Sequence, residues 1–179
     1  MTSQREAFPR RTGPVVIGYD GSPAAERALA EAAAVLRPGP ALVVVAWEAG
    51  RAYEAAEWQA ITLDVPVPTV DLRTAAELDH AGYACAQRAG QQGAAIARAL
   101  GLPAVSLVVA EDADVAQTLV RVAREQDAPA LVIGRRHHGA LSETLLGSTE
   151  RSVLDSAPCP VLVVREDGEH ETPDREEVS

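Results

Sequence analysis

The stretch LVIGRRHHGALSETLLGSTERSVLDSAPCPVLVV, from Leu131 to Val164, decides the fold of this chain. It begins with a short apolar run, continues through a loop that holds Gly134 and Gly147, and ends in a second apolar run. This order predicts a strand, a loop, a helix and a strand. A loop that leaves the carboxyl end of a strand and leads into a helix presents unpaired backbone N–H groups and the positive end of a helix dipole. Both features suit an anion such as phosphate, so the stretch predicts an anion-binding loop.

Apolar runs of strand length alternate with longer stretches of helical period along the chain. Five such runs are found, at Val15–Gly18, Ala41–Trp47, Ala104–Val109, Ala130–Ile133 and Val161–Val164. Because each run is almost continuously apolar, we expect both of its faces to be covered, as in parallel sheets. The alternation predicts an α/β fold, an open, doubly wound, five-stranded parallel sheet with helices on both faces. Ligands of such sheets bind at the carboxyl ends of the strands, where the winding direction switches.

Four helices are expected between and after these strands. The first runs from Pro23 to about Leu36, with Ser22 as its N-cap. The third begins near Val115, and the fourth spans Thr149 to about Ser156. The second, at about residues 72–100, contains three glycines that each cost roughly 0.5 to 1 kcal/mol relative to alanine. A bend or break is therefore expected there, at Gly82, Gly90 or Gly93.

One domain is expected at residues 14–165, because 179 residues with 47% hydrophobic content can bury one core of ordinary size. Within it, residues 48–70 show no clear period and predict a surface insertion. Residues 1–13 are polar and predict a flexible arm. The acidic, apolar-poor residues 166–179 predict a disordered tail.

The charge balance narrows the class of partner. The chain has 26 acidic and 16 basic residues, a net charge of -10, so a nucleic-acid backbone would be repelled. No run of about 18 apolar residues occurs, so neither a membrane span nor a signal sequence is expected. Cys85 and Cys159 make no disulfide framework and fit a reducing compartment. We therefore expect a cytoplasmic protein without nucleic-acid or membrane partners.

Asp20 directly follows the first strand, which places a carboxylate at the carboxyl edge of the predicted sheet. There it could accept hydrogen bonds from the base or sugar of a ligand. The same carboxylate could instead accept bonds from its own turn, because the dipeptide Asp20-Gly21 favours turns on local grounds. The sequence leaves both interpretations open.

Gly147 and Ser148 stand where the last helix is expected to begin. Ser148 is a good N-cap residue, whose hydroxyl normally accepts a bond from the backbone two or three residues on. In a binding site, Gly147 would let the backbone approach a phosphate and Ser148 would donate its hydroxyl to it. Together with Gly134, at the end of the preceding strand, these residues are expected to face one crevice.

Arg135, Arg136, His137 and His138 form a positive cluster on this acidic chain. Arginine binds phosphate bidentately, so one of them facing the crevice would add charge-assisted bonds, and a solvated loop face is the alternative. Adjacent histidines without companion ligands at metal spacing do not predict a zinc site. No nucleophile elbow or Walker phosphate loop occurs, so no catalytic residue is assigned. An enzyme would need Asp20 or His137 as a general base.

These segments resemble the universal stress protein family in three places. The run VVIGYDGSP, Val15 to Pro23, is similar to the family's first strand and turn. Leu131 to Ser148 is similar to its nucleotide loop, and Pro158 to Val164 resembles its final strand. The resemblance spans about Pro14 to Val164. It implies the family's α/β/α sandwich, of the adenine nucleotide alpha-hydrolase-like type, with strand order 3-2-1-4-5.

The resemblance also implies ATP or another adenine nucleotide as the ligand, with Mg²⁺ or Mn²⁺ accompanying its phosphates. By the same resemblance, Asp20 lies near the base and the backbone around Trp47 binds adenine. Trp47 is bulky where the family commonly has a smaller aliphatic residue, and its indole could stack on a base. The expected nucleotide-binding set is completed by the loop residues Gly134, Arg136, His137, Gly147 and Ser148.

Two residues depart from the family pattern. Nucleotide-binding members read Gly-x-x-Gly, nine residues, then Gly-Ser/Thr, and Gly134 and Gly147 keep that spacing while His137 replaces the second glycine. If that position needs a positive φ, the replacement costs roughly 1 to 2 kcal/mol, or about tenfold in affinity. Glu150 stands in the first turn of the last helix, where the family often has a small hydroxylated residue. Its carboxylate is expected at the helix end that should hold phosphate.

The last strand, Val161 to Val164, carries an implication for assembly. An apolar strand at the edge of a sheet tends to pair with another chain. Members of the family that this chain resembles form homodimers through this strand, so the resemblance implies a homodimer here. We expect a homodimeric, nucleotide-binding stress or regulatory protein rather than a metabolic enzyme. Two alternatives stay open: an interaction scaffold that has lost nucleotide binding through His137 and Glu150, and a slow nucleotide hydrolase that uses Asp20 or His137.

Overall fold

The computed structural model describes residues 11–48, 72–111, 113–135 and 147–165. The predicted tail, nearly all of the insertion and most of the arm lie outside these ranges. So do Arg136 and His137 of the predicted site.

Five parallel strands form one sheet in the order β3-β2-β1-β4-β5, which confirms the predicted fold and strand order. The strands are β1 (Val15–Gly18), β2 (Ala41–Trp47), β3 (Ala104–Ala110), β4 (Leu131–Arg135) and β5 (Val161–Arg165). The chain winds outward from β1 to β3 and then crosses back to β4, on the other side of β1. The winding direction therefore switches between β1 and β4, where a doubly wound sheet holds its ligands.

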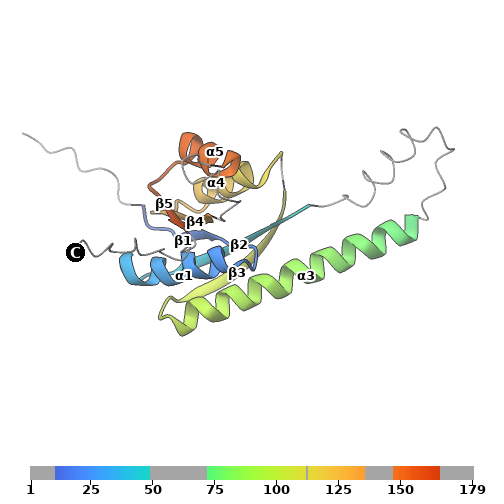
Figure 1. Cartoon of the computed structure of the whole chain (residues 1–179), viewed down its shortest axis with the longest axis horizontal. Helices are drawn as coiled ribbons and strands as arrows, with labels where there is room; N and C mark the ends of the chain where they lie inside the picture. Colours follow the sequence, from blue (N-terminus) through green and yellow to red (C-terminus); the bar gives the residue numbers. More distant parts are fainter. Residues whose placement is uncertain (1–10, 49–71, 112, 136–146, 166–179) are drawn as a thin grey trace, which may run out of the picture.

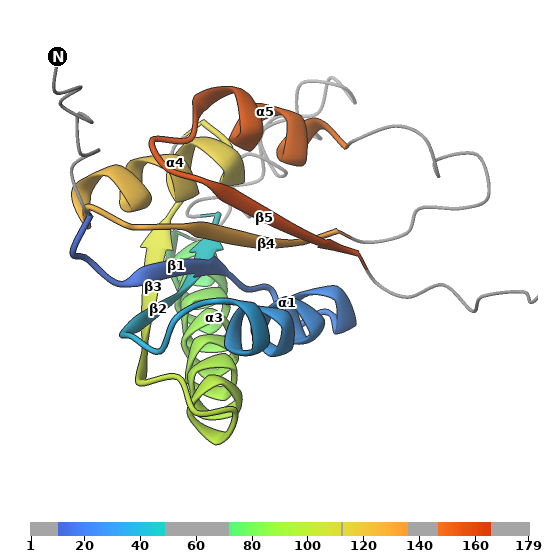
Figure 2. The ribbon, with the colours of Figure 1, turned by 90° about the vertical axis from the view of Figure 1, so that its left-hand side faces the viewer.

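In the described part of the chain, two helices cover each face of the sheet (Figures 1 and 2). α1 (Pro23–Val35) and α3 (Leu72–Ala99) lie on one face, and α4 (Val115–Glu125) and α5 (Ser148–Ser156) lie on the other. Neighbouring strand residues point to opposite faces, so Ile17 packs toward α1 and α3 while Val16 packs toward α4 and α5. Figure 1 shows that α3 extends well beyond the sheet.

Side-chain caps set the start of two helices. The Ser22 hydroxyl accepts a hydrogen bond from Ala25 N–H at 3.2 Å, which confirms the predicted cap of α1. Asp114 accepts from Gln117 N–H at 2.7 Å and caps α4 in the same way. The predicted cap of the last helix is wrong, because α5 begins one residue earlier and Gly147 is its N-cap, without a side-chain bond. Glycine ranks close to threonine as an N-cap residue, so Gly147 is acceptable at this position.

The expected break in the second helix is absent, because α3 is continuous from Leu72 to Ala99. Two of its glycines lie where the helix crosses the sheet closely. A Cβ added at Gly90 would stand 3.2 Å from the Ser106 Cβ, and one added at Gly93 would stand 2.9 Å from the Tyr19 ring. Close packing against the sheet therefore accounts for these glycines and offsets their cost in helix propensity.

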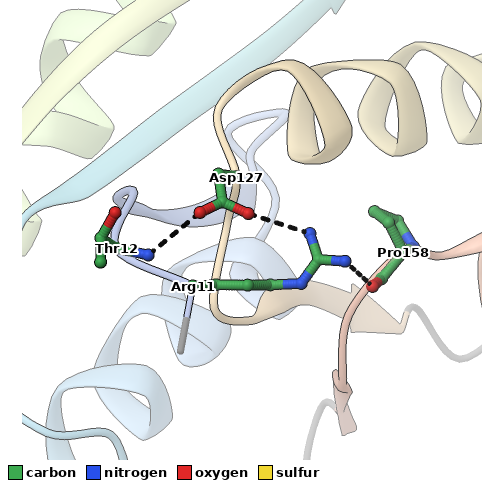
Figure 3. Close-up of polar contacts among 4 residues, drawn as sticks. All are labelled: Arg11, Thr12, Asp127 and Pro158. Atoms are coloured by element: carbon green, nitrogen blue, oxygen red, sulfur yellow. Dashed lines mark hydrogen bonds and ion pairs between the residues drawn. The ribbon is translucent and has the colours of Figure 1, made fainter. Parts of the chain in front are cut away.

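The end of the predicted arm is held near the amino ends of β4 and β5 by the polar contacts drawn in Figure 3. The Arg11 guanidinium donates to the Pro158 carbonyl and lies 3.5 Å from the Asp127 carboxylate. Thr12 N–H donates to the same carboxylate at 3.2 Å, and Gly13 N–H donates to the Asp127 carbonyl at 3.2 Å. These contacts tie the arm to the turn between α4 and β4 and to the connection from α5 to β5.

Candidate functional site

A cavity of about 460 Å³ opens at the carboxyl ends of β1, β2 and β4. Cavities of roughly 300 to 1,000 Å³ are typical of small-molecule sites. Its walls come from the ends of three strands, from the start of α1 and α4, and from the first turn of α5. The lining residues are Gly18, Tyr19, Asp20, Ala25, Val44, Ala46, Val115, Leu119, Ile133, Gly134, Arg135, Gly147, Ser148, Thr149 and Glu150.

Asp20 has the turn role that the sequence considered, and its contact with a ligand stays a prediction. Its Oδ1 accepts a hydrogen bond from Ser22 N–H at 2.9 Å, and the turn continues through Gly21 at φ +79°. That backbone conformation favours glycine. The Asp20 side chain is also exposed and lines the cavity. The turn therefore holds the carboxylate in place at the mouth of the candidate site.

Gly134 has a structural reason to be glycine that does not involve a ligand. A Cβ at this position would collide with the Ala24 carbonyl and stand 2.8 Å from Ala25 N, both in the first turn of α1. The helix start thus crosses the end of β4 too closely for a side chain. Gly134 also lines the cavity, so the close packing brings the α1 start and the β4 end to the same site.

The first turn of α5 faces the cavity with its backbone amides uncommitted within the helix. The first intrahelical bond runs from Arg151 N–H to the Gly147 carbonyl at 3.1 Å. The N–H groups of the three preceding residues therefore have no partner within the helix, as at every helix start. Ser148 and Thr149 are exposed there and add two hydroxyls. This arrangement is suited to an anion.

Glu150 already places a carboxylate at this helix start. It is the third residue of α5, it is half-buried, and its side chain folds back onto the N-cap. A Cβ added at Gly147 would lie 3.2 Å from the Glu150 Cδ and 3.5 Å from Oε1, and it would collide with Oε2. The space beside Gly147 that the sequence assigned to a phosphate is therefore occupied by the protein's own carboxylate.

Trp47 is not among the residues that line the cavity. Its ring pairs with Tyr83 of α3, with centroids 5.3 Å apart and planes at 60°. The preceding residue, Ala46, faces the cavity instead, since neighbouring strand residues point to opposite sides. An indole stacked on a bound base does not fit this arrangement, whereas contact through the backbone near Trp47 stays a prediction.

Arg135 brings a positive charge to the cavity. It is the last residue of β4, is half-buried and lines the site. The sequence placed Arg135 in the basic cluster, one member of which could contact phosphate, but named Arg136 in the expected nucleotide-binding set. The signal that favours Arg135 is its position, because it directly follows Gly134 at the carboxyl end of a strand.

The side chains of Tyr19 and Cys159 both have raised pKa values. Burial, with the nearby charges of Glu26 and Asp20, raises the pKa of Tyr19. Its hydroxyl is buried and has no hydrogen-bond partner in the described structure. Burial also raises the pKa of the Cys159 thiol, and Arg11 opposes that rise.

The described residues show no group of three or more His, Cys, Asp or Glu side chains placed to hold a metal ion. Among the same residues, no helix is both long and apolar enough to cross a membrane.

Comparison with known proteins assigns the family. The model of the Universal stress protein family matches residues 12–165. The chain belongs to the universal stress protein family. It is 31% identical over 152 residues to the universal stress protein in the QAH/OAS sulfhydrylase 3' region of Thermus aquaticus, covering 84% of this chain and 97% of that protein.

Solved structures of universal stress proteins share the fold. The universal stress protein from Archaeoglobus fulgidus in complex with dAMP has a TM-score of 0.57 and 24% identity, covering 86% of this chain and 98% of that one. A family protein from Arabidopsis thaliana with AMP bound has a TM-score of 0.58 and 12% identity, covering 90% and 97%. At these identities the likeness establishes the architecture alone.

Proposed function

We propose that this universal stress protein is a cytoplasmic stress-response or regulatory protein that binds ATP or a related adenine nucleotide in the cavity between β1 and β4. The observation that carries the proposal is the placement of that cavity. It joins the switch point of the sheet to a helix start that has no side-chain cap, which is where anionic ligands of such folds bind. The dAMP and AMP complexes of the two relatives support an adenine nucleotide as the ligand class.

The two ends of the cavity suit different parts of a nucleotide. Asp20 offers a carboxylate that accepts hydrogen bonds from a ribose or base, while Arg135 and the amides of the α5 start suit phosphate. Mg²⁺ or Mn²⁺ would enter with the phosphates of ATP, because such ions are commonly bound through substrate phosphates. No residue is assigned a catalytic role, and the protein is proposed as a sensor or adaptor.

Titration calorimetry with ATP and Mg²⁺ tests the proposal, and Asp20→Asn tests the site. The variant keeps an oxygen that accepts from Ser22 N–H but removes the charge that would hold a ribose hydroxyl. We expect the wild type to bind and Asp20→Asn to bind about five- to tenfold more weakly, because a hydrogen bond to a charged group contributes about 1 kcal/mol more than one to a neutral group. Asp155→Asn, on the exposed far turn of α5, is the matched control and should bind normally.

Absence of both heat and thermal stabilisation at millimolar ATP, AMP and adenosine would defeat the nucleotide proposal. Normal binding by Asp20→Asn would instead leave the ligand class standing and remove Asp20 from the site.

A further inference from the structure

We propose that Glu150 determines how many phosphates the bound ligand carries, so that the cavity prefers adenosine and AMP to ATP. This inference rests on the proposed function and narrows its ligand class. It concerns one side chain at the helix start rather than the presence of the site.

The position of the carboxylate is the first reason. α5 has no side-chain cap, and Glu150 folds back from the third position until its carboxylate fills the space where a Cβ of residue 147 would lie. A negative charge at a helix start is stabilised by the dipole and by the unpaired amides. The helix start thus has an anion of its own, covalently tethered and therefore present at high effective concentration.

The space beside Gly147 is the second reason. A glycine at this position would normally let a phosphate oxygen approach the backbone. Here the Glu150 Cδ lies only 3.2 Å from where a Cβ of residue 147 would be, and Oε2 is closer still. A phosphate group that reached the α5 amides would have to displace this carboxylate. A ligand that ends before the helix start would leave it in place.

The charge of the cavity is the third reason. Among the described lining residues, Asp20 and Glu150 carry negative charges and Arg135 carries a positive one. Each additional phosphate on the ligand therefore meets described side chains whose charges already sum to a negative value. In a partly buried site such repulsion is screened less than in open solvent. The penalty grows from adenosine, which is uncharged, through AMP to ATP.

Calorimetric titrations of adenosine, AMP and ATP into wild type, Glu150→Gln and Asp155→Asn test the inference. ATP is measured both with Mg²⁺ and with a chelator. Glu150→Gln keeps the shape of the side chain and removes its charge. We expect it to raise ATP affinity about five- to tenfold and to change adenosine affinity less than about twofold. Asp155→Asn removes a charge from the far end of the same helix and should change no affinity by more than about twofold.

Two results would overturn the inference while the proposed function survives. One is an ATP to adenosine affinity ratio that is unchanged in Glu150→Gln. The other is a loss of ATP affinity, which would show that the carboxylate assists binding, for instance through Mg²⁺. If no ligand binds to any of the three proteins, the proposed function fails and this inference fails with it. Glu150→Ser provides a second variant in case Glu150→Gln unfolds at a markedly lower temperature than the wild type.

Discussion

Tyr19 has a buried polar atom with no partner in the described structure. The residue is 4% exposed, its ring packs beside Gly93 of α3, and its hydroxyl makes no hydrogen bond. Burying a hydroxyl without a partner costs roughly 1 to 3 kcal/mol, whereas the ring itself is well packed. We therefore expect Tyr19→Phe to leave the free energy of unfolding unchanged or to raise it by up to about 1 kcal/mol. Urea denaturation at pH 7 measures this.

Tyr19→Phe should also change how the free energy of unfolding depends on pH above about 10. Burial raises the pKa of Tyr19, so the folded chain keeps the phenol protonated to higher pH than the unfolded chain does. Stability is unaffected below the ordinary value near 10 and falls as pH rises above it, because the unfolded state then binds fewer protons. Tyr19→Phe should lose part of this alkaline destabilisation. The remainder includes Cys159, whose raised pKa acts in the same direction from about pH 9. Identical stability profiles for the two proteins between pH 9 and 11 would contradict the assignment.

The site shows which residue-scale features a sequence can predict. Asp20, Gly134, Gly147 and Ser148 were predicted to lie at one site, and all four line the cavity. Each lies next to the end of a strand or the start of a helix, and the topology of the sheet brings such positions together. The sequence predicted the Glu150 carboxylate at the start of α5 but not its fold back onto Gly147, since that depends on one rotamer at the helix start. Nor could the contact between Gly134 and the α1 backbone, because it joins segments that are distant in the sequence.

Strands were predicted more accurately than the details of the helices. Each predicted strand lies within two residues of the observed one, because continuous apolar runs leave little choice of state in a parallel sheet. The error at α5 arose because Gly147 and Ser148 are both acceptable N-caps. The expected break in α3 was wrong because helix propensity is a local property, whereas Gly90 and Gly93 are explained by the neighbouring sheet.

Two glycines of α3 give a matched pair of variants at the scale of the element. A Cβ at Gly93 would stand 2.9 to 3.0 Å from the Tyr19 ring, while nothing lies within 4 Å of a Cβ at Gly82. We expect Gly82→Ala to stabilise the protein by about 0.5 to 1 kcal/mol through helix propensity alone. Gly93→Ala should destabilise it by about 1 to 3 kcal/mol, because the clash outweighs the same gain. Denaturation curves of the two variants should therefore move in opposite directions from the wild type, and a shift in the same direction would refute the packing account of Gly93.

At the scale of the whole molecule, the sheet has two outer strands, β3 and β5. Within the described residues, β5 pairs with β4 alone and carries the apolar run Val161 to Val164. The first three residues of that run are only half-buried in this single chain. The outer strand at the other side, β3, is interrupted by the exposed Ser106. The other outer strand, β3, also exposes an apolar side chain, because Val105 is 61% exposed. Pairing β5 with a second copy would cover its continuous apolar run, so we propose a homodimer through Val161 to Val164.

The strand register indicates which backbone groups would form that dimer. The Pro160 carbonyl accepts from Leu131 N–H at 3.0 Å, so Pro160 points its backbone groups toward β4. Alternation along the strand then directs those of Val161 and Val163 outward. Val163→Pro removes an outward N–H without breaking the ladder to β4, as proline on an edge strand can. We expect light scattering at micromolar concentration to give a dimer for the wild type and a monomer for this variant, with the circular dichroism of both unchanged.

Ser106→Pro is the matched control for this change. The Pro103 carbonyl accepts from Ala41 N–H at 2.8 Å, and the same alternation then turns the Ser106 N–H outward on β3. If β5 forms the interface, Ser106→Pro stays dimeric, and a monomer with this variant and not with Val163→Pro would move the interface to β3. A monomeric wild type would exclude both edges. The candidate cavity lies at the carboxyl ends of β1, β2 and β4 and none of its lining residues belongs to β5. Loss of the dimer in Val163→Pro should therefore leave nucleotide affinity unchanged, which separates the assembly from the binding site.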